Sequence, residues 1–268
     1  FLQARARFGI EIDVVPDDDM GEVDLAALEA ALDRPGVRLV ALTHVPTSGG
    51  LVNPAAEVGR LARAAGVLFL LDACQSAGQM PLDVETLGCD FLSATGRKFL
   101  RGPRGTGFLY VRRSLLEQLA PPFLDLHGAE WTAPDRYEMA EGAIRFENFE
   151  GNIAGKRALG VAIDYALDWG LAEIEDRITS LAERLRERLA ALPGVAVHDR
   201  GRRKCGIVTF TKESVAPPAL QAALRGQAAA STLLDMSGRG LSALARASVH
   251  YFNTEVEVDR VVATVAAL

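Results

Sequence analysis

Cysteine is scarce in this chain: only Cys74, Cys89 and Cys205 occur among 268 residues. They are too few and too far apart for the disulfide framework of a small secreted domain. None of them has metal-ligand spacing with the four histidines, so no metal site is predicted. We therefore expect each cysteine to be a small buried apolar side chain.

The chain also lacks long apolar runs and an excess of positive charge. Its longest apolar stretches are strand-sized, well short of the roughly 20 residues that span a bilayer, and no signal-like segment opens the sequence. A net charge of −6 offers no general attraction for nucleic acid. The expectation is a cytoplasmic protein with neither a membrane nor a nucleic-acid partner.

An initiator methionine is missing as well. The segment 1–9 begins with Phe1 and has the pattern of the second half of an amphipathic helix. From this we expect that an N-terminal part of the fold is absent from the chain.

Strand and helix patterns alternate through the first half of the sequence. Strands are expected at 10–15, 37–43, 67–71, 90–93 and 107–111. Helices are expected at 24–32 with Asp24 as N-cap, at 54–65 with Asn53 as N-cap, and from Arg113 onward. Such alternation predicts an α/β fold with a mostly parallel sheet and helices on its faces.

The second half has a different pattern. Between 121 and 151 the periodicity lapses, and helical periodicity then returns at 152–169 and 171–192. Short strands at 195–198, 206–211 and 245–252, with helices at 218–224 and 255–268, predict a smaller α+β domain whose sheet is antiparallel. We expect two domains, 1–165 and 166–268.

Asp72 and Lys98 are the residues most suggestive of chemistry. Asp72 closes the apolar run 67–71, and Lys98 lies one strand-helix-strand step later. The carboxyl ends of parallel strands share one edge of a sheet, where ligands of open α/β folds bind. A carboxylate there can keep a pyridine nitrogen protonated, and an amine can capture an aldehyde, which suits pyridoxal phosphate. Lys98 is the predicted Schiff-base lysine and the group that moves the α proton.

Three neighbouring side chains fit the same cofactor. Gln75, on the turn after Asp72, could donate to the phenolic oxygen of the ring. Thr95 and Arg97 flank Lys98 with a hydroxyl and a guanidinium, and both groups suit a phosphate.

The stretch 40–111 resembles the class V aminotransferase and cysteine desulfurase group of fold-type I pyridoxal phosphate enzymes. The motifs that carry the resemblance are Leu42-Thr43-His44-Val45 followed by Gly50, then Asp72-Ala73-Cys74-Gln75, then Thr95-Gly96-Arg97-Lys98 and Gly102-Pro103-Arg104-Gly105-Thr106-Gly107. The run Ser-Ala-Thr-x-Arg-Lys followed by Gly-Pro-Arg-Gly is most similar to a subset that includes hercynylcysteine sulfoxide lyases.

The resemblance implies further roles. Arg246, in an Arg-x-Ser segment, would bind the α-carboxylate of an amino-acid substrate. Asn152 lies in what resembles a subunit-interface loop that reaches the phosphate of the other subunit, so a homodimer is expected. His44 and Thr47 are also candidate cofactor contacts, although the family usually has asparagine where Thr47 stands.

The expected function is that of a class V aminotransferase-like enzyme acting at the α-carbon of a small amino acid through the Lys98 Schiff base. A carbon-sulfur lyase similar to hercynylcysteine sulfoxide lyase is the alternative. A cysteine desulfurase is less favoured, because residues 231–245, ahead of Arg246, contain no cysteine to attack the substrate sulfur. A non-catalytic homologue is a further alternative.

Each candidate also has a structural interpretation. Lys98 could be a solvated loop residue and Asp72 a helix N-cap. Arg246 could pair with Glu255 or Glu257, and His44 could be a hydrogen-bonded core histidine.

Overall fold

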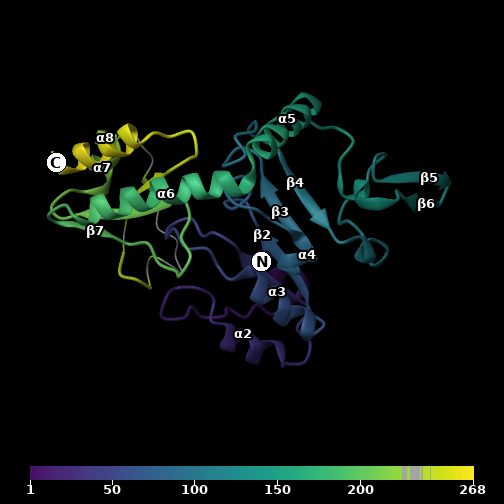
Figure 1. Cartoon of the computed structure of the whole chain (residues 1–268). Coiled ribbons are helices and arrows are strands. Elements are labelled where there is room, and N and C mark those ends of the chain that lie inside the picture. The colour runs from purple at the N-terminus through teal and green to yellow at the C-terminus, as the bar shows by residue number, and fades with distance from the viewer. Residues whose placement is uncertain (225–227, 230–235, 237, 242) are drawn as a thin grey trace.

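The computed structural model describes residues 1–224, 228–229, 236, 238–241 and 243–268. Its first half is built on a four-stranded sheet in the order β1-β2-β3-β4 (Figure 1). The strands are β1 (Leu39–Thr43), β2 (Leu68–Asp72), β3 (Phe91–Thr95) and β4 (Gly107–Val111). The helices before and between them are α1 (Leu2–Phe8), α2 (Leu25–Leu32), α3 (Ala55–Ala64) and α4 (Val84–Leu87).

The pairing of these strands confirms the mostly parallel sheet. β1 pairs with β2 and β2 with β3 in parallel, whereas β4 runs antiparallel to β3. Phe69 and Leu71 of β2 are fully buried, while Leu68 and Leu70 on its other face are only half-buried. β2 is thus less completely covered than a central parallel strand usually is.

Two expectations in this half are wrong. The segment 10–15 forms no strand, because no other described segment pairs with it, and Ile10 and Val14 are exposed. Asn53 does not cap α3, whose N-cap is Pro54. The Asn53 side chain instead accepts from the Val23 backbone N–H and donates to the Thr43 carbonyl, so it ties β1 to the chain before α2. Asp24 does cap α2, as predicted.

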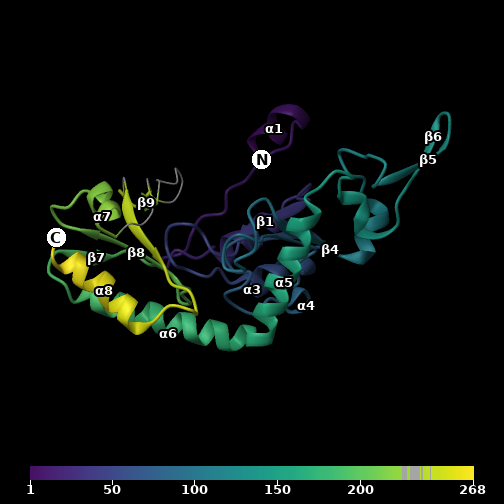
Figure 2. The same cartoon turned by 90° about the horizontal axis from the view of Figure 1, so that it is seen from above.

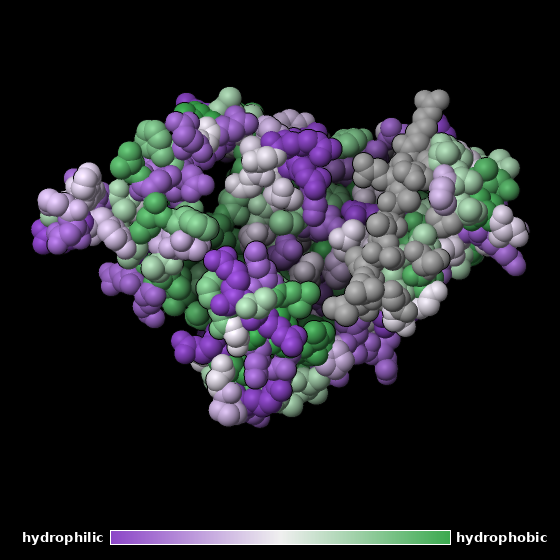
Figure 3. Space-filling view, turned by 180° about the vertical axis from the view of Figure 1, so that it is seen from behind, coloured by the Kyte–Doolittle hydropathy of each residue, from purple (hydrophilic) through white to green (hydrophobic). Residues whose placement is uncertain are grey.

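The segment 113–151 contains more structure than its pattern indicates. The helix expected from Arg113 is a short 3₁₀ helix (Arg113–Gln118), and a second one (Gly142–Phe146) precedes α5. Between them, β5 (Ala129–Ala133) and β6 (Arg136–Met139) form a hairpin that projects from the body of the molecule (Figures 1 and 2). The tip of this hairpin is largely hydrophilic (Figure 3).

The second half contains a second four-stranded sheet, in the order β7-β8-β10-β9. All three of its strand pairings are antiparallel, as predicted. Its elements are α5 (Ile153–Trp169), α6 (Leu171–Ala190), β7 (Val195–Val197), β8 (Ile207–Lys212), α7 (Pro217–Leu224), β9 (Ala228–Ala229), β10 (Leu244–Ser248) and α8 (Glu255–Ala266). β10 ends at Ser248, four residues earlier than expected, because the chain turns between His250 and Asn253.

The described residues form three large groups of buried side chains and a small fourth one at Met236 and Leu244. One lies between β1–β3 and helices α2 and α3, and another packs α6 and α8 on the antiparallel sheet. A third group joins the two halves and includes Val45, Phe99, Ile174, Ile178 and Ile207. Because this junction is apolar and buried, it fixes the orientation of the two sheets. The proposed division between residues 165 and 166 falls within α5 and stays a prediction.

Candidate functional site

The polar residues that the sequence analysis singled out follow the ends of β2 and β3. β2 ends at Asp72 and β3 at Thr95, and Asp72 pairs in register with Ser93. Asp72 lies at the end of a strand rather than on a helix, and its Oδ1 accepts from the Cys74 backbone N–H at 2.9 Å. The Asp72 carboxylate, the Gln75 amide and the Lys98 amine therefore belong to residues at, or just after, the carboxyl ends of β2 and β3. This is the edge of the sheet where the site was predicted.

Lys98 is half-buried on the turn after β3. Burial lowers the pKa of its amine; Cys74 and Asp72 act in the opposite direction, and Arg97 and Arg246 add to the lowering. Electrostatic effects of this kind fall off with distance. The residue is thus not a freely solvated lysine, and charged groups from both halves of the chain act on its pKa.

Gln75 links the two halves of this site. It is buried, and its Nε2 has no hydrogen-bond partner among the described residues. Its Oε1 accepts from Arg246 Nη2 at 3.4 Å. A buried amide donor without a partner costs about 1–3 kcal/mol, so such a group in a native protein calls for an acceptor. Gln75 is therefore placed to donate to a bound ligand.

Arg246 does not pair with Glu255 or Glu257, as its structural interpretation would require. Glu255 pairs with Arg177, and Glu257 bonds to the backbone and side chain of Thr254. Arg246 itself donates to Ser248 Oγ at 3.2 Å and to Gln75, and burial lowers the pKa of its guanidinium. Within the part of the chain that the structure describes, no carboxylate therefore neutralises Arg246, which suits a group that binds a carboxylate from outside.

The phosphate candidates are distributed differently. Thr95 is half-buried, with its Oγ1 3.4 Å from the Thr106 carbonyl, while Arg97 and Thr47 are exposed. Asn152 is exposed at the start of α5, where its side chain accepts from the Gly155 N–H at 2.8 Å and caps the helix. Their roles toward a phosphate stay predictions.

His44 fits its structural alternative better than a cofactor contact. The ring is buried, and its Nδ1 lies 3.0 Å from Ser76 Oγ. Burial first, and then the charge of Arg203, lowers the pKa of His44 to about 4. A neutral, hydrogen-bonded core histidine matches these observations.

None of the three cysteines is activated as a nucleophile. Burial raises the pKa of Cys89 and that of Cys205 to about 11. Cys74 is half-buried beside Gln75; its pKa is raised first by burial and then by Asp72, against the effect of Lys98. Because the thiolate is the nucleophile, all three are poorly suited to attack sulfur.

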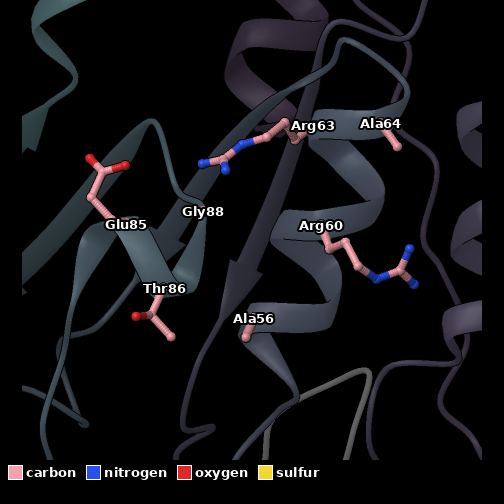
Figure 4. A pocket seen from close by; sticks show the side chains of 7 residues that line it. All are labelled: Ala56, Arg60, Arg63, Ala64, Glu85, Thr86 and Gly88. Atoms are coloured by element: carbon pink, nitrogen blue, oxygen red, sulfur yellow. The ribbon is translucent and has the colours of Figure 1, made fainter.

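A separate hollow of about 290 Å³ lies between α3 and α4 (Figure 4). Arg63 extends from α3 toward Gly88, while Arg60 points away from α4. None of the candidate residues lines it. Within the described parts of the chain, no helix has both the length and the apolar character needed to cross a membrane, and no group of three or more His, Cys, Asp or Glu could hold a metal.

Gln79 is a site-supporting residue that the sequence analysis missed. Buried beneath the turn, it donates to the Gln75 carbonyl and accepts from the Gly206 N–H at 3.2 Å. Gly206 precedes β8, which pairs with the strand that carries Arg246. No local pattern could have shown this contact, because 127 residues separate the partners.

Comparison with known families identifies the class of protein. A sequence model of the class-V aminotransferase family matches residues 1–261. The chain belongs to this family.

Curated relatives are named for sulfur chemistry. A probable cysteine desulfurase of Methanothermobacter thermautotrophicus is 31% identical over 97% of this chain and 67% of its own length. A cysteine desulfurase of Serratia proteamaculans is 35% identical over 95% of this chain and 64% of its own. The chain spans about two thirds of the length of the curated relatives that it matches.

Solved structures give the same fold. An apo cysteine desulfurase from Thermococcus onnurineus has a TM-score of 0.92 at 30% identity, covering 99% of this chain and 68% of that one. The cystine C-S lyase C-DES, solved with its product cysteine persulfide, has a TM-score of 0.86 at 29% identity, covering 99% and 71%. A C-DES variant has been solved with glycine covalently linked to its pyridoxal phosphate. The fold is that of fold-type I, as predicted.

Proposed function

We propose that this chain forms part of a pyridoxal phosphate enzyme that cleaves the Cβ–S bond of a small sulfur-containing amino acid by elimination. The observation that carries the proposal is the convergence of Asp72, Gln75, Lys98 and Arg246 at one edge of the parallel sheet. They combine an amine, a carboxylate, a buried amide donor and a guanidinium that no carboxylate among the described residues neutralises.

These residues fit the cofactor. The unpartnered Gln75 Nε2 would donate to its phenolic oxygen, Asp72 would hold the proton of its ring nitrogen, and Lys98 would attach it. When bound, pyridoxal phosphate supplies an aldehyde that condenses with amines and a ring that withdraws electrons from the substrate α-carbon.

The remaining work falls to the protein side chains. Arg246 would bind and orient the α-carboxylate of the substrate in a bidentate pair. Lys98 would remove the proton from the substrate Cα, for which its lowered pKa is an advantage because more of the amine is neutral near pH 7. The Cβ–S bond then breaks, and its electron pair leaves with sulfur. With one water consumed, cysteine would yield pyruvate, ammonia and hydrogen sulfide.

The raised pKa values of the three cysteine thiols favour elimination over a reaction that forms a persulfide on the protein. Desulfuration through a protein persulfide needs a thiolate, and the pKa of each of the three thiols is raised. Elimination needs none, because the sulfur leaves unassisted. The names of the relatives favour sulfur chemistry over the amino transfer that the sequence analysis placed first.

Cysteine desulfuration is the second candidate, because the relatives that are 31–35% identical carry that name. Cys74, the least buried of the three cysteines, would be its nucleophile. Part of the segment 231–245 lies outside the described residues, but its lack of cysteine is a property of the sequence.

A product assay separates these reactions. The protein, reconstituted with pyridoxal phosphate, is incubated with L-cysteine, L-cystine or an alkylcysteine sulfoxide, with and without a keto acid. Elimination predicts pyruvate and ammonia in equal amounts without a keto acid. Alanine with persulfide would instead show desulfuration, and a product that forms only with the keto acid would show amino transfer.

Lys98→Ala should lower the elimination rate by about 10⁴-fold or more, because one residue attaches the cofactor and moves the proton. Borohydride should fix the cofactor on Lys98 of the parent protein, as mass spectrometry of the peptide would detect. A Lys98→Ala protein that retains the parental rate would contradict the proposal.

A homodimer and a cytoplasmic location belong to this proposal as expectations from the resemblance and the composition. Trp131, Tyr137 and Phe149, on and near the projecting hairpin, are exposed in the single chain. Aromatic residues of this kind are enriched at subunit interfaces.

A further inference from the structure

The turn that follows Lys98 has an unusual backbone. Arg101 has a φ of 58°, and among the described residues only Ser214 is another non-glycine residue with positive φ. The Arg101 N–H donates to the Lys98 carbonyl at 2.9 Å, so this residue closes the turn that carries the amine. L-residues rarely adopt such a φ unless the surrounding structure holds them in place.

The Arg101 side chain provides that hold. Its guanidinium lies over the rings of Tyr165, Tyr251 and Phe252, at 5.0, 4.9 and 5.5 Å from their centroids. It also donates a hydrogen bond to the Tyr251 hydroxyl. A guanidinium within about 6 Å of a ring centroid is attracted by the ring quadrupole. Arg101 therefore connects the Lys98 turn to the segment 250–252 and to α5.

His250 makes a second connection from the same segment. Its Nδ1 accepts from the Tyr251 backbone N–H at 3.0 Å, so its Nε2 carries the proton that is donated to the Phe99 carbonyl, also at 3.0 Å. The ring is stacked on Phe99 and on Phe252. Burial lowers the pKa of His250 to about 4, so the neutral ring with this tautomer is the form present at neutral pH.

The segment 250–252 directly continues the chain from β10, which carries Arg246 and Ser248. The turn that carries Lys98 is thus fastened at residues 99 and 101 to the strand that carries Arg246. These contacts lie outside the hydrogen bonds of either sheet, and neither Arg101 nor His250 has a role in the proposed reaction.

We propose that Arg101 and His250 are positioning residues that clamp the Lys98 turn to the segment after β10 and thereby fix the amine and the Arg246 guanidinium relative to each other. The significance of that spacing rests on the proposed function, in which Arg246 holds the carboxylate while Lys98 reaches the neighbouring Cα. The clamp itself is a property of the chain without cofactor.

Arg101→Gly is a suitable test, because glycine accepts a φ of 58° without strain and only the side chain is lost. Ser214→Gly is the matched control: Ser214 has a φ of 62° and lies between β8 and α7, outside the site. Arg101→Lys keeps a cation that can reach the rings but lacks the planar fork that bonds Tyr251.

The first readout is the pKa of Lys98 in cofactor-free protein, obtained by competitive labelling with acetic anhydride across pH and mass spectrometry. Burial lowers this pKa, Arg97 and Arg246 lower it further, and Cys74 and Asp72 raise it. Loosening the clamp admits water and lets Arg246 move away. The labelling midpoint should therefore move to higher pH in Arg101→Gly, less in Arg101→Lys, and not at all in Ser214→Gly.

The second readout is kcat/KM for the substrate that the product assay identifies. Misplacement on the order of 1 Å predicts a fall of about 10- to 100-fold in Arg101→Gly, with part of the rate retained in Arg101→Lys. An unchanged labelling midpoint and an unchanged kcat/KM in Arg101→Gly would overturn the inference, as would an equal shift in Ser214→Gly. A shifted midpoint in a protein that turns over no substrate would support the clamp and reject the proposed function.

Discussion

The two sheets contribute to the candidate site in different ways. The parallel sheet provides its groups at strand ends: Asp72 ends β2, and Lys98 follows β3, so adjacent strands bring them to one edge. The antiparallel sheet contributes Arg246 from within a strand, opposite Thr209 of β8. Nothing in either sheet alone places Arg246 beside Gln75. The parallel sheet alone brings Asp72 and Lys98 to one edge, whereas the position of Arg246 relative to them depends on how the two halves are joined.

The junction between the halves is both apolar and polar. Beside its buried aliphatic side chains lies Arg186 of α6, which is 6% exposed and belongs to the antiparallel half. Its Nη2 donates to the carbonyl of Ile207, a residue of the junction, and its Nε donates to Asp199 at 2.7 Å. Asp199 also accepts from the backbone N–H and the hydroxyl of Thr209, at 2.8 and 2.6 Å. If the junction couples the two halves into one cooperative unit, a substitution that destabilises one half should lower the free energy of unfolding of both.

Asp199→Ala is expected to have the largest effect on this comparison. It leaves the buried Arg186 guanidinium without its buried carboxylate partner, which costs roughly 3–5 kcal/mol. Hydrogen exchange followed by mass spectrometry should show that peptides of β2 and of β8 lose protection together. Loss confined to residues 195–212 would show instead that the two halves unfold separately.

A matched control uses the other partner of the same guanidinium. Glu183 lies 3.0 Å from Arg186 Nη1, but its side chain is 52% exposed. Exposed ion pairs contribute only about 0–1 kcal/mol, so Glu183→Ala should change protection little in either half. Equal effects of Asp199→Ala and Glu183→Ala would mean that the stabilisation does not depend on burial of the Arg186–Asp199 pair.

Lowering the pH provides a second test, because it destabilises the parallel half through His44. His44 follows β1, and its pKa is about 4 in the folded chain and near 6.5 when unfolded. The unfolded chain therefore binds the proton first, and stability is lost as pH falls from about 6.5 toward 4. The loss at pH 5 should be roughly 2 kcal/mol for this ring. His44→Asn, which can still bond Ser76, should reduce the decline in urea stability between pH 7 and 5.

The parent protein also contains His198 and His250, whose pKa values are lowered mainly by burial. Some decline in acid should therefore remain in His44→Asn. A decline identical to that of the parent protein would mean that His44 does not titrate as a buried group.

The sequence predicted the parts of the fold and site that depend on short-range physics. The run 67–71 is apolar enough to be recognised as a strand, and its end places Asp72 correctly. The segment 10–15 looks like a strand, but strand formation needs a partner, and no pattern within the segment says whether one exists. Asn53-Pro54 has the pattern of a helix start, yet the Asn53 side chain accepts from the Val23 N–H and donates to the Thr43 carbonyl.

The support of the site was not predictable for the same reason. Gln79 and Arg101 act through partners 127 and 150 residues away, and neither belongs to a motif that shows this. The hairpin of β5 and β6 was missed because its strands are exposed and rich in polar residues, without the alternation that marks a half-buried strand. The positions of the candidate residues at the strand ends were thus easier to predict than the contacts that hold them together.

Thr254→Ala gives the smallest effect and the sharpest comparison, because it acts on the antiparallel half alone. Thr254 and Glu257 form a capping box at the start of α8: Thr254 Oγ1 accepts from the Glu257 N–H at 3.2 Å, and Glu257 accepts from the Thr254 N–H at 2.9 Å. Its loss should cost about 1 kcal/mol. In a single cooperative unit, exchange from β2 should become faster by the same free energy as exchange from β8. If only β8 responds, the two sheets are separate units, and the position of Arg246 beside Gln75 then depends on docking rather than on folding.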